Sequence, residues 1–85
     1  MSLTEQEIVG ALGMIVYEVT DIPAAEVTLD KRFVQDLDID SLAMAEILVE
    51  AHSKFGIEIP DERLRELSTV KDIVAYIQQE QEVAR

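Results

Sequence analysis

The sequence contains no cysteine and few basic residues, and each shortage excludes a class of function. Without cysteine, this chain of 85 residues forms no disulfide framework, no thiolate metal site and no thiol nucleophile. Eighteen acidic residues against seven basic ones give a formal net charge of −11. Such a surface repels nucleic-acid phosphate and anionic lipid, so we expect neither as a partner. It favours proteins with basic surfaces, although acidity can also serve solubility alone.

Long apolar runs and targeting signals are also missing. No run of about eighteen apolar residues occurs, so we expect no membrane-spanning helix. The first residues, MSLTEQEIVG, have neither a basic stretch nor an apolar segment, so we expect no signal peptide and a cytoplasmic protein. No repeat or linker divides the chain. We therefore expect a single domain over residues 1–85 that is monomeric.

Helical periodicity dominates the first part of the chain. Thr4 and Glu7 have the spacing of a capping box, and apolar residues follow at intervals of three and four. The sequence Asp21-Ile22-Pro23 should end this helix, because the residue before a proline disfavours helical geometry. A long connection over residues 21–40 follows. It carries spaced apolar residues that should anchor it to the core: Ile22, Val27, Leu29, Phe33 and Leu37.

The second half of the chain predicts three further helical segments. One should run from Asp40 or Ser41 to about Lys54, with Gly56 as its C-cap. A short helical turn is expected over residues 60–67, and a last helix should begin after a cap at Thr69.

Together these segments predict an all-α fold, a small four-helix bundle. It has three main helices, one short helix and a long loop between the first two. We expect an ordered core over residues 4–79 and a frayed tail over residues 80–85.

The stretch DLDIDSL, residues 36–42, concentrates acids beside a serine. Asp36, Asp38 and Asp40 match the first three ligand positions of an EF-hand calcium loop. The match then fails, because Ser41 replaces the glycine of the sixth position and Ile47 the glutamate of the twelfth. A β-strand is equally unsupported, since the chain offers no partner strand. We expect no metal site.

Helix chemistry accounts for the same stretch. Asp40 is a favoured N-cap, and Asp38 lies near the positive end of the helix dipole. Ser41 should then be exposed in the first turn. The only histidine, His52, lies eleven residues later, about 16 Å along the helix axis, too far to act as a base for this hydroxyl. We therefore expect no catalytic residue.

The predicted second helix has an unusual outward face. Its core side should carry Met44, Ile47, Leu48, Ala51 and Phe55. Its outward side carries Leu42, Glu46, Val49, Glu50 and Ser53. Two large apolar residues framed by acids, one turn from an exposed serine, indicate a docking surface for a cationic partner.

These features resemble the acyl carrier proteins of fatty acid and polyketide synthesis, over almost the whole chain. The most specific element is Asp40-Ser41-Leu42, and FGIEIPDE (55–62) and TVKDIVAYI (69–77) match as well. The segment FVQDLDIDSLAMAEI (33–47) looks most like free-standing fatty acid synthase carriers of actinobacteria, including those that feed mycolate-type elongation.

The resemblance implies a carrier without catalytic residues, a phosphoprotein in which Ser41 receives 4'-phosphopantetheine from coenzyme A through a separate transferase. The arm's thiol would hold the acyl chain as a thioester. Asp40 and Leu42 flank the attachment site. Implied partners are ketosynthase, acyltransferase, reductase and dehydratase enzymes with basic surfaces. The implied docking residues are Leu42, Ala45, Glu46, Val49, Glu50 and Ile59, the last of which touches the arm or lines the acyl pocket.

Two departures from the family pattern bear on partner choice. Ala43 stands where many carriers have an acid, and His52-Ser53-Lys54 stands where many have glutamates. Three alternatives to a fatty acid carrier follow. The first is a carrier of a polyketide or other specialised pathway. A peptidyl carrier fits less well because of the acidic D-I-D run. The third is an acidic helical adaptor with no prosthetic group.

Overall fold

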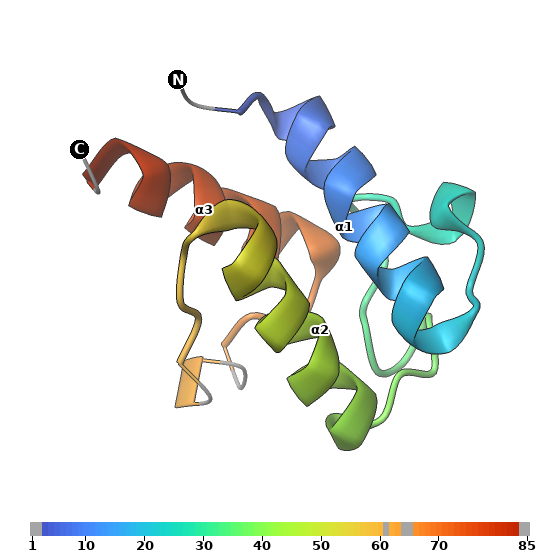
Figure 1. The fold of residues 1–85 in the computed structure, drawn as a ribbon. Helices are drawn as coiled ribbons and strands as arrows, with labels where there is room; N and C mark the ends of the chain where they lie inside the picture. Colours follow the sequence, from blue (N-terminus) through green and yellow to red (C-terminus); the bar gives the residue numbers. More distant parts are fainter. Residues whose placement is uncertain (1–2, 61, 64–65, 84–85) are drawn as a thin grey trace.

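The computed structural model describes residues 3–60, 62–63 and 66–83. Its elements are α1 (Glu5–Thr20), the short 3-10 turn η1 (Ala24–Glu26), α2 (Ser41–Phe55) and α3 (Val70–Val83). Helix α1 contacts α2, η1 and α3. Figure 1 shows the connection between α1 and α2 folded beside α1. The all-helical arrangement agrees with the class that the sequence predicts.

The helix ends coincide with the predicted capping residues. The Thr4 hydroxyl accepts a hydrogen bond from the Glu7 backbone N–H at 3.2 Å, and the Glu7 carboxylate accepts one from the Thr4 N–H at 2.8 Å. The Asp40 carboxylate caps α2 by accepting the Ala43 N–H at 2.8 Å. Helix α2 ends at Gly56, whose φ of 70° is in the left-handed region that glycine tolerates. A reciprocal cap opens α3 in the same way as at α1.

The apolar stripes of the three helices meet in one core. From α1 come Ile8, Leu12, Ile15 and Val16; from α2 Met44, Ile47, Leu48 and Ala51; from α3 Val70, Ile73, Val74 and Ile77. The connection adds Val27, Phe33, Leu37 and Ile39. No polar or charged side chain is buried among the described residues. The hydrophobic effect of this cluster holds the helices together.

Backbone hydrogen bonds attach the long connection to the start of α3. The Phe33 N–H donates to the Ser68 carbonyl at 3.1 Å, and the Val70 N–H donates to the Lys31 carbonyl at 2.9 Å. The Lys71 N–H likewise donates to the carbonyl of Leu29. The connection is therefore packed onto the core, as its spaced apolar residues predict.

Two sequence predictions concern the last third of the chain. The predicted short helix over 60–67 falls partly on residues 61, 64 and 65, which lie outside the described residues. Around them, the Arg63 N–H donates to the Pro60 carbonyl and the Leu67 N–H to the Arg63 carbonyl, as in a helical turn.

The second prediction concerns the end of the chain. Helix α3 runs to Val83, past residue 79, and the fraying of residues 80–85 stays a prediction. One contact joins this last stretch to the start of the chain. The Gln81 side chain accepts the Leu3 N–H at 2.9 Å and donates to the Leu3 carbonyl at 3.3 Å.

Candidate functional site

Ser41 is the first residue of α2 and is exposed. The first turn of α2 contains no acidic residue, and Asp40 precedes this turn as the N-cap. Asp40 takes up two of the turn's amides: its carboxylate accepts the Ala43 N–H and its carbonyl accepts the Met44 N–H. A helix N-terminus of this kind favours an anionic group such as a phosphate diester at Ser41.

A pocket of about 480 Å³ opens beside Ser41. We call it the Ser41 pocket; it is lined by Phe33, Val34, Gln35, Ile39, Asp40, Ser41, Met44, Leu67 and Ser68. Its volume falls within the range of about 300–1,000 Å³ that is common for small-molecule sites. Since most of its lining is apolar, it suits a hydrocarbon chain better than a charged ligand.

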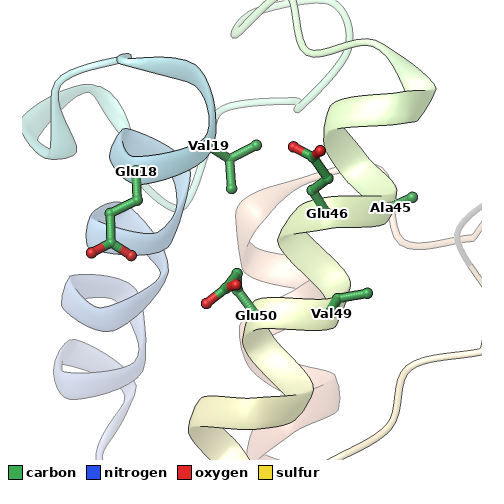
Figure 2. Close-up of a pocket in the computed structure, with 6 residues that line it drawn as sticks. All are labelled: Glu18, Val19, Ala45, Glu46, Val49 and Glu50. Carbon is green, nitrogen blue, oxygen red and sulfur yellow. The ribbon is translucent and has the colours of Figure 1, made fainter.

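The outward face of α2 agrees with the face expected from the sequence. Leu42 and Val49 are 73% and 67% exposed, and Ala45, Glu46, Glu50 and Ser53 are exposed as well. In Figure 2, Ala45 and Val49 lie on one flank of α2, whereas Glu46 and Glu50 project toward α1. The face therefore divides into an apolar flank and an acidic flank.

The acidic flank of α2 borders a groove that the sequence analysis missed. This inter-helix groove has a volume of about 460 Å³ and is lined by Glu18, Val19, Ala45, Glu46, Val49 and Glu50. Glu18 and Val19 belong to the end of α1, and Figure 2 shows Val19 facing α2. Helical periodicity alone marks Glu18 as exposed. It gives no sign that α2 lies opposite, because that placement depends on tertiary packing.

Ile59 is the one predicted docking residue that the structure places elsewhere. Its side chain is only 5% exposed and belongs to the core. It also does not line the Ser41 pocket. A side chain packed among core residues is placed to meet an arm or acyl chain between the helices rather than the surface of a partner, and the role of Ile59 stays a prediction.

The acids of the DLDIDSL stretch have separate roles. The Asp36 carboxylate accepts the Arg32 N–H at 2.8 Å and forms an ion pair with the Arg32 guanidinium at 3.5 Å. These contacts, the backbone hydrogen bond first, hold the pKa of Asp36 below its usual value. Asp38 adopts a left-handed φ of 57°, and Asp40 caps α2. Within the described part of the chain, no cluster of three acidic or histidine side chains has metal-binding geometry.

Among the described residues, no helix has both the length and the apolar character needed to cross a membrane. His52, the only histidine, is exposed in the last turn of α2, at the opposite end from Ser41. The separation confirms that it cannot contact the serine hydroxyl.

Comparison with known proteins points to one family. The family model described as "Phosphopantetheine attachment site" matches residues 11–77. The chain is 55% identical to an acyl carrier protein of Thermobifida fusca, over 92% of this chain and 99% of that one. It is 54% identical to a meromycolate extension acyl carrier protein of Mycolicibacterium smegmatis, over 96% of this chain and 83% of that one. An acyl carrier protein structure from Enterococcus faecalis superposes with a TM-score of 0.72 at 32% identity, covering 91% and 98% of the two chains.

Proposed function

This chain belongs to the acyl carrier protein family, and we propose that Ser41 carries its 4'-phosphopantetheine arm. As a member of this family the chain is a carrier without catalysis of its own. The observation that supports Ser41 most strongly is its position: an exposed serine at the start of α2, within the matched attachment-site region and beside an apolar pocket. When bound, the arm supplies the terminal thiol that holds an acyl group as a thioester.

The residues around Ser41 suit each part of such an arm. The positive end of the α2 dipole favours the phosphate that joins the arm to the serine. The apolar lining of the Ser41 pocket offers an acyl chain shelter from water, with Phe33 and Met44 at its inner boundary. The protein thus contributes an attachment point and a shelter, and the partner enzymes contribute the chemistry.

Partner enzymes would dock on the outward face of α2. Its apolar flank, with Leu42, Ala45 and Val49, provides contact area next to Ser41. Its acidic flank, with Glu46 and Glu50, favours enzymes with basic surfaces and speeds their approach. The phosphopantetheinyl transferase and the enzymes of fatty acid synthesis are the partners that the family implies.

The pathway that we propose is fatty acid synthesis. The meromycolate extension carrier of M. smegmatis is 54% identical to this chain, so elongation of long mycolate-type chains is one variant of this function that we include in the proposal. The attachment-site match argues against an adaptor without a prosthetic group.

Intact mass spectrometry tests the attachment site. The protein is incubated with coenzyme A, magnesium and a phosphopantetheinyl transferase that modifies a known carrier in a parallel reaction. We expect the parent and Ser53→Ala, a change at another exposed serine of α2, to gain one phosphopantetheinyl group each. Ser41→Ala should gain none while keeping its helical circular dichroism. A modified Ser41→Ala variant would show that another residue carries the arm, and an unmodified parent would contradict the carrier function itself.

A further inference from the structure

The Ser41 pocket has an apolar interior and a polar rim. Its interior is formed by the buried side chains of Phe33, Ile39 and Met44. The polar side chains that line it are all exposed: Gln35, Asp40, Ser41 and Ser68. These polar groups therefore lie where the pocket opens to solvent.

Two of the four polar groups already have a role. The Asp40 carboxylate accepts the Ala43 N–H as the cap of α2, and the Ser41 hydroxyl is the proposed attachment point. The side-chain hydrogen bonds between described residues include none made by the Gln35 amide or the Ser68 hydroxyl. These two groups remain available to a ligand at the rim.

Gln35 lies in a loop whose backbone is held by hydrogen bonds. The Arg32 carbonyl accepts the Asp36 N–H at 2.9 Å, and the Asp36 carboxylate accepts the Arg32 N–H at 2.8 Å. The Phe33 N–H donates to the Ser68 carbonyl at 3.1 Å and attaches the same loop to the start of α3. The backbone on both sides of Gln35 is thus fixed before a ligand arrives, which lowers the entropic cost of binding there.

The chemistry of the proposed arm calls for hydrogen-bonding groups at this rim. Phosphopantetheine has two secondary amides between its phosphate and its thiol. Because Ser41 itself lines the pocket, an acyl chain enters it only if the arm folds back toward the serine. The two amides then lie near the rim and lose part of their contact with water. Such a loss costs free energy unless protein groups replace the hydrogen bonds.

We propose that the side-chain amide of Gln35 binds the pantetheine part of the arm and holds the folded-back arm across the opening of the Ser41 pocket. This role rests on the carrier function and on attachment of the arm at Ser41. A glutamine amide both accepts and donates, so it can accept the N–H of one arm amide and donate to the carbonyl of the other. Gln35 is also uncharged, unlike Asp36 beside it, so it adds no repulsion toward the phosphate.

Side-chain amide signals in the NMR spectrum test the contact directly. The sequence contains no asparagine, so these signals come from glutamines alone: Gln6, Gln35, Gln78, Gln79 and Gln81. The Gln35→Met variant identifies the Gln35 signals by their disappearance. Loading an octanoyl-pantetheine arm from octanoyl-coenzyme A should shift the Gln35 signals and leave those of Gln6 and Gln81, which do not line the pocket, in place. Unchanged Gln35 signals after loading would overturn the proposal.

Cleavage of the octanoyl thioester by hydroxylamine measures how often the arm leaves the pocket. Gln35→Met keeps the length of the side chain and removes its hydrogen-bonding groups, so we expect cleavage to be faster by roughly two- to tenfold, the range of one hydrogen bond. Gln6→Met is the matched control, the same change in the first turn of α1, and should be cleaved at the parent rate. Equal rates for the two variants would contradict the contact.

Two further measurements separate the possible causes of failure. Intact mass confirms loading before each experiment, so a parent that gains no arm would contradict the carrier function itself. If the parent is loaded and Gln35→Met has no effect, attachment at Ser41 stands and the Gln35 contact is wrong. The melting temperature of the protein without its arm should be the same for Gln35→Met and the parent, because the side chain is exposed. A lower value would assign faster cleavage to a loosened fold and would also contradict the proposal.

Discussion

The Ser41 pocket and the inter-helix groove both open beside α2 and differ little in volume, about 480 and 460 Å³. Their linings differ in burial and in charge. Phe33, Ile39 and Met44 at the Ser41 pocket are core residues with at most 6% exposure. The groove is bordered by exposed carboxylates and by Val49.

We infer from this difference that α2 can meet cargo and partners through separate surfaces. A ligand in the Ser41 pocket touches the residues that stabilise the fold, so cargo and stability should be coupled. A ligand in the groove touches exposed side chains, so changes there should alter association and leave stability nearly intact. Each prediction below tests this separation or the contacts that support it.

The largest expected effect is on stability at the Ser41 pocket. Phe33→Ala should lower the free energy of unfolding by about 3–5 kcal/mol, because Phe33 is 2% exposed and its removal leaves a cavity. Val49→Ala, an apolar truncation at the groove, should cost less than about 0.5 kcal/mol. Urea denaturation of both variants measures the contrast. Similar losses in the free energy of unfolding would show that the Ser41 pocket and the inter-helix groove contribute equally to stability.

Loading with acyl groups should stabilise the protein through the Ser41 pocket. Each methylene buried there contributes about 0.8 kcal/mol, partly offset by opening of the packed interior. The melting temperature of a series of acyl-loaded proteins should therefore rise with chain length and level off once the pocket is full. A flat response from short to long chains would place the cargo in solvent.

Two glycines of α1 test the close approach between this helix and η1. A Cβ on Gly13 would lie 3.1 Å from the carbonyl oxygen of Ala24, whereas a Cβ on Gly10 meets nothing within 4 Å. Gly10→Ala should stabilise by about 0.5–1 kcal/mol through helix propensity. Gly13→Ala should fall below it by about 1 kcal/mol or more, because the neighbour must shift. Thermal denaturation of the two variants measures this difference. Equal gains in stability would show that the close approach to Ala24 has no energetic cost.

The smallest expected effect concerns acid stability beside the Ser41 pocket. The pKa of Asp36 is lowered in the folded protein, so its stabilising contribution is present above its ordinary value of about 3.9 and lost as the pH falls. The melting temperature of Asp36→Asn should be slightly below the parent at neutral pH, and the gap should close in acid. A gap that stays constant with pH would mean that the charge of Asp36 contributes nothing.

Sequence periodicity was sufficient for the features that depend on local chemistry. Thr4 with Glu7, Asp40 and Gly56 mark helix ends through contacts within a few residues, so the pattern predicts them directly. The division of α2 into a buried and an outward face follows from the helical repeat for the same reason. The position of Ser41 at the start of α2 is a consequence of both.

Features that depend on contacts between residues far apart in the sequence could not be predicted from helical periodicity. Gln81 of α3 forms hydrogen bonds with Leu3, 78 residues away in sequence. Glu18 joins the groove only because α1 packs on α2. Ile59 was expected at a partner surface because its family position suggested it, whereas packing in this chain buries it. Local patterns carry no information on such neighbours.

The separation of cargo from partner is tested most directly by the amide NMR spectrum of one labelled sample. It is recorded without an arm, then with an acylated arm, then with a partner enzyme added. Acylation should shift residues of the Ser41 pocket such as Phe33 and Ile39, and the partner should shift Leu42, Glu46 and Val49. If both additions perturb the same residues, or if acylation leaves Phe33 and Ile39 unchanged, cargo and partner do not bind at separate surfaces.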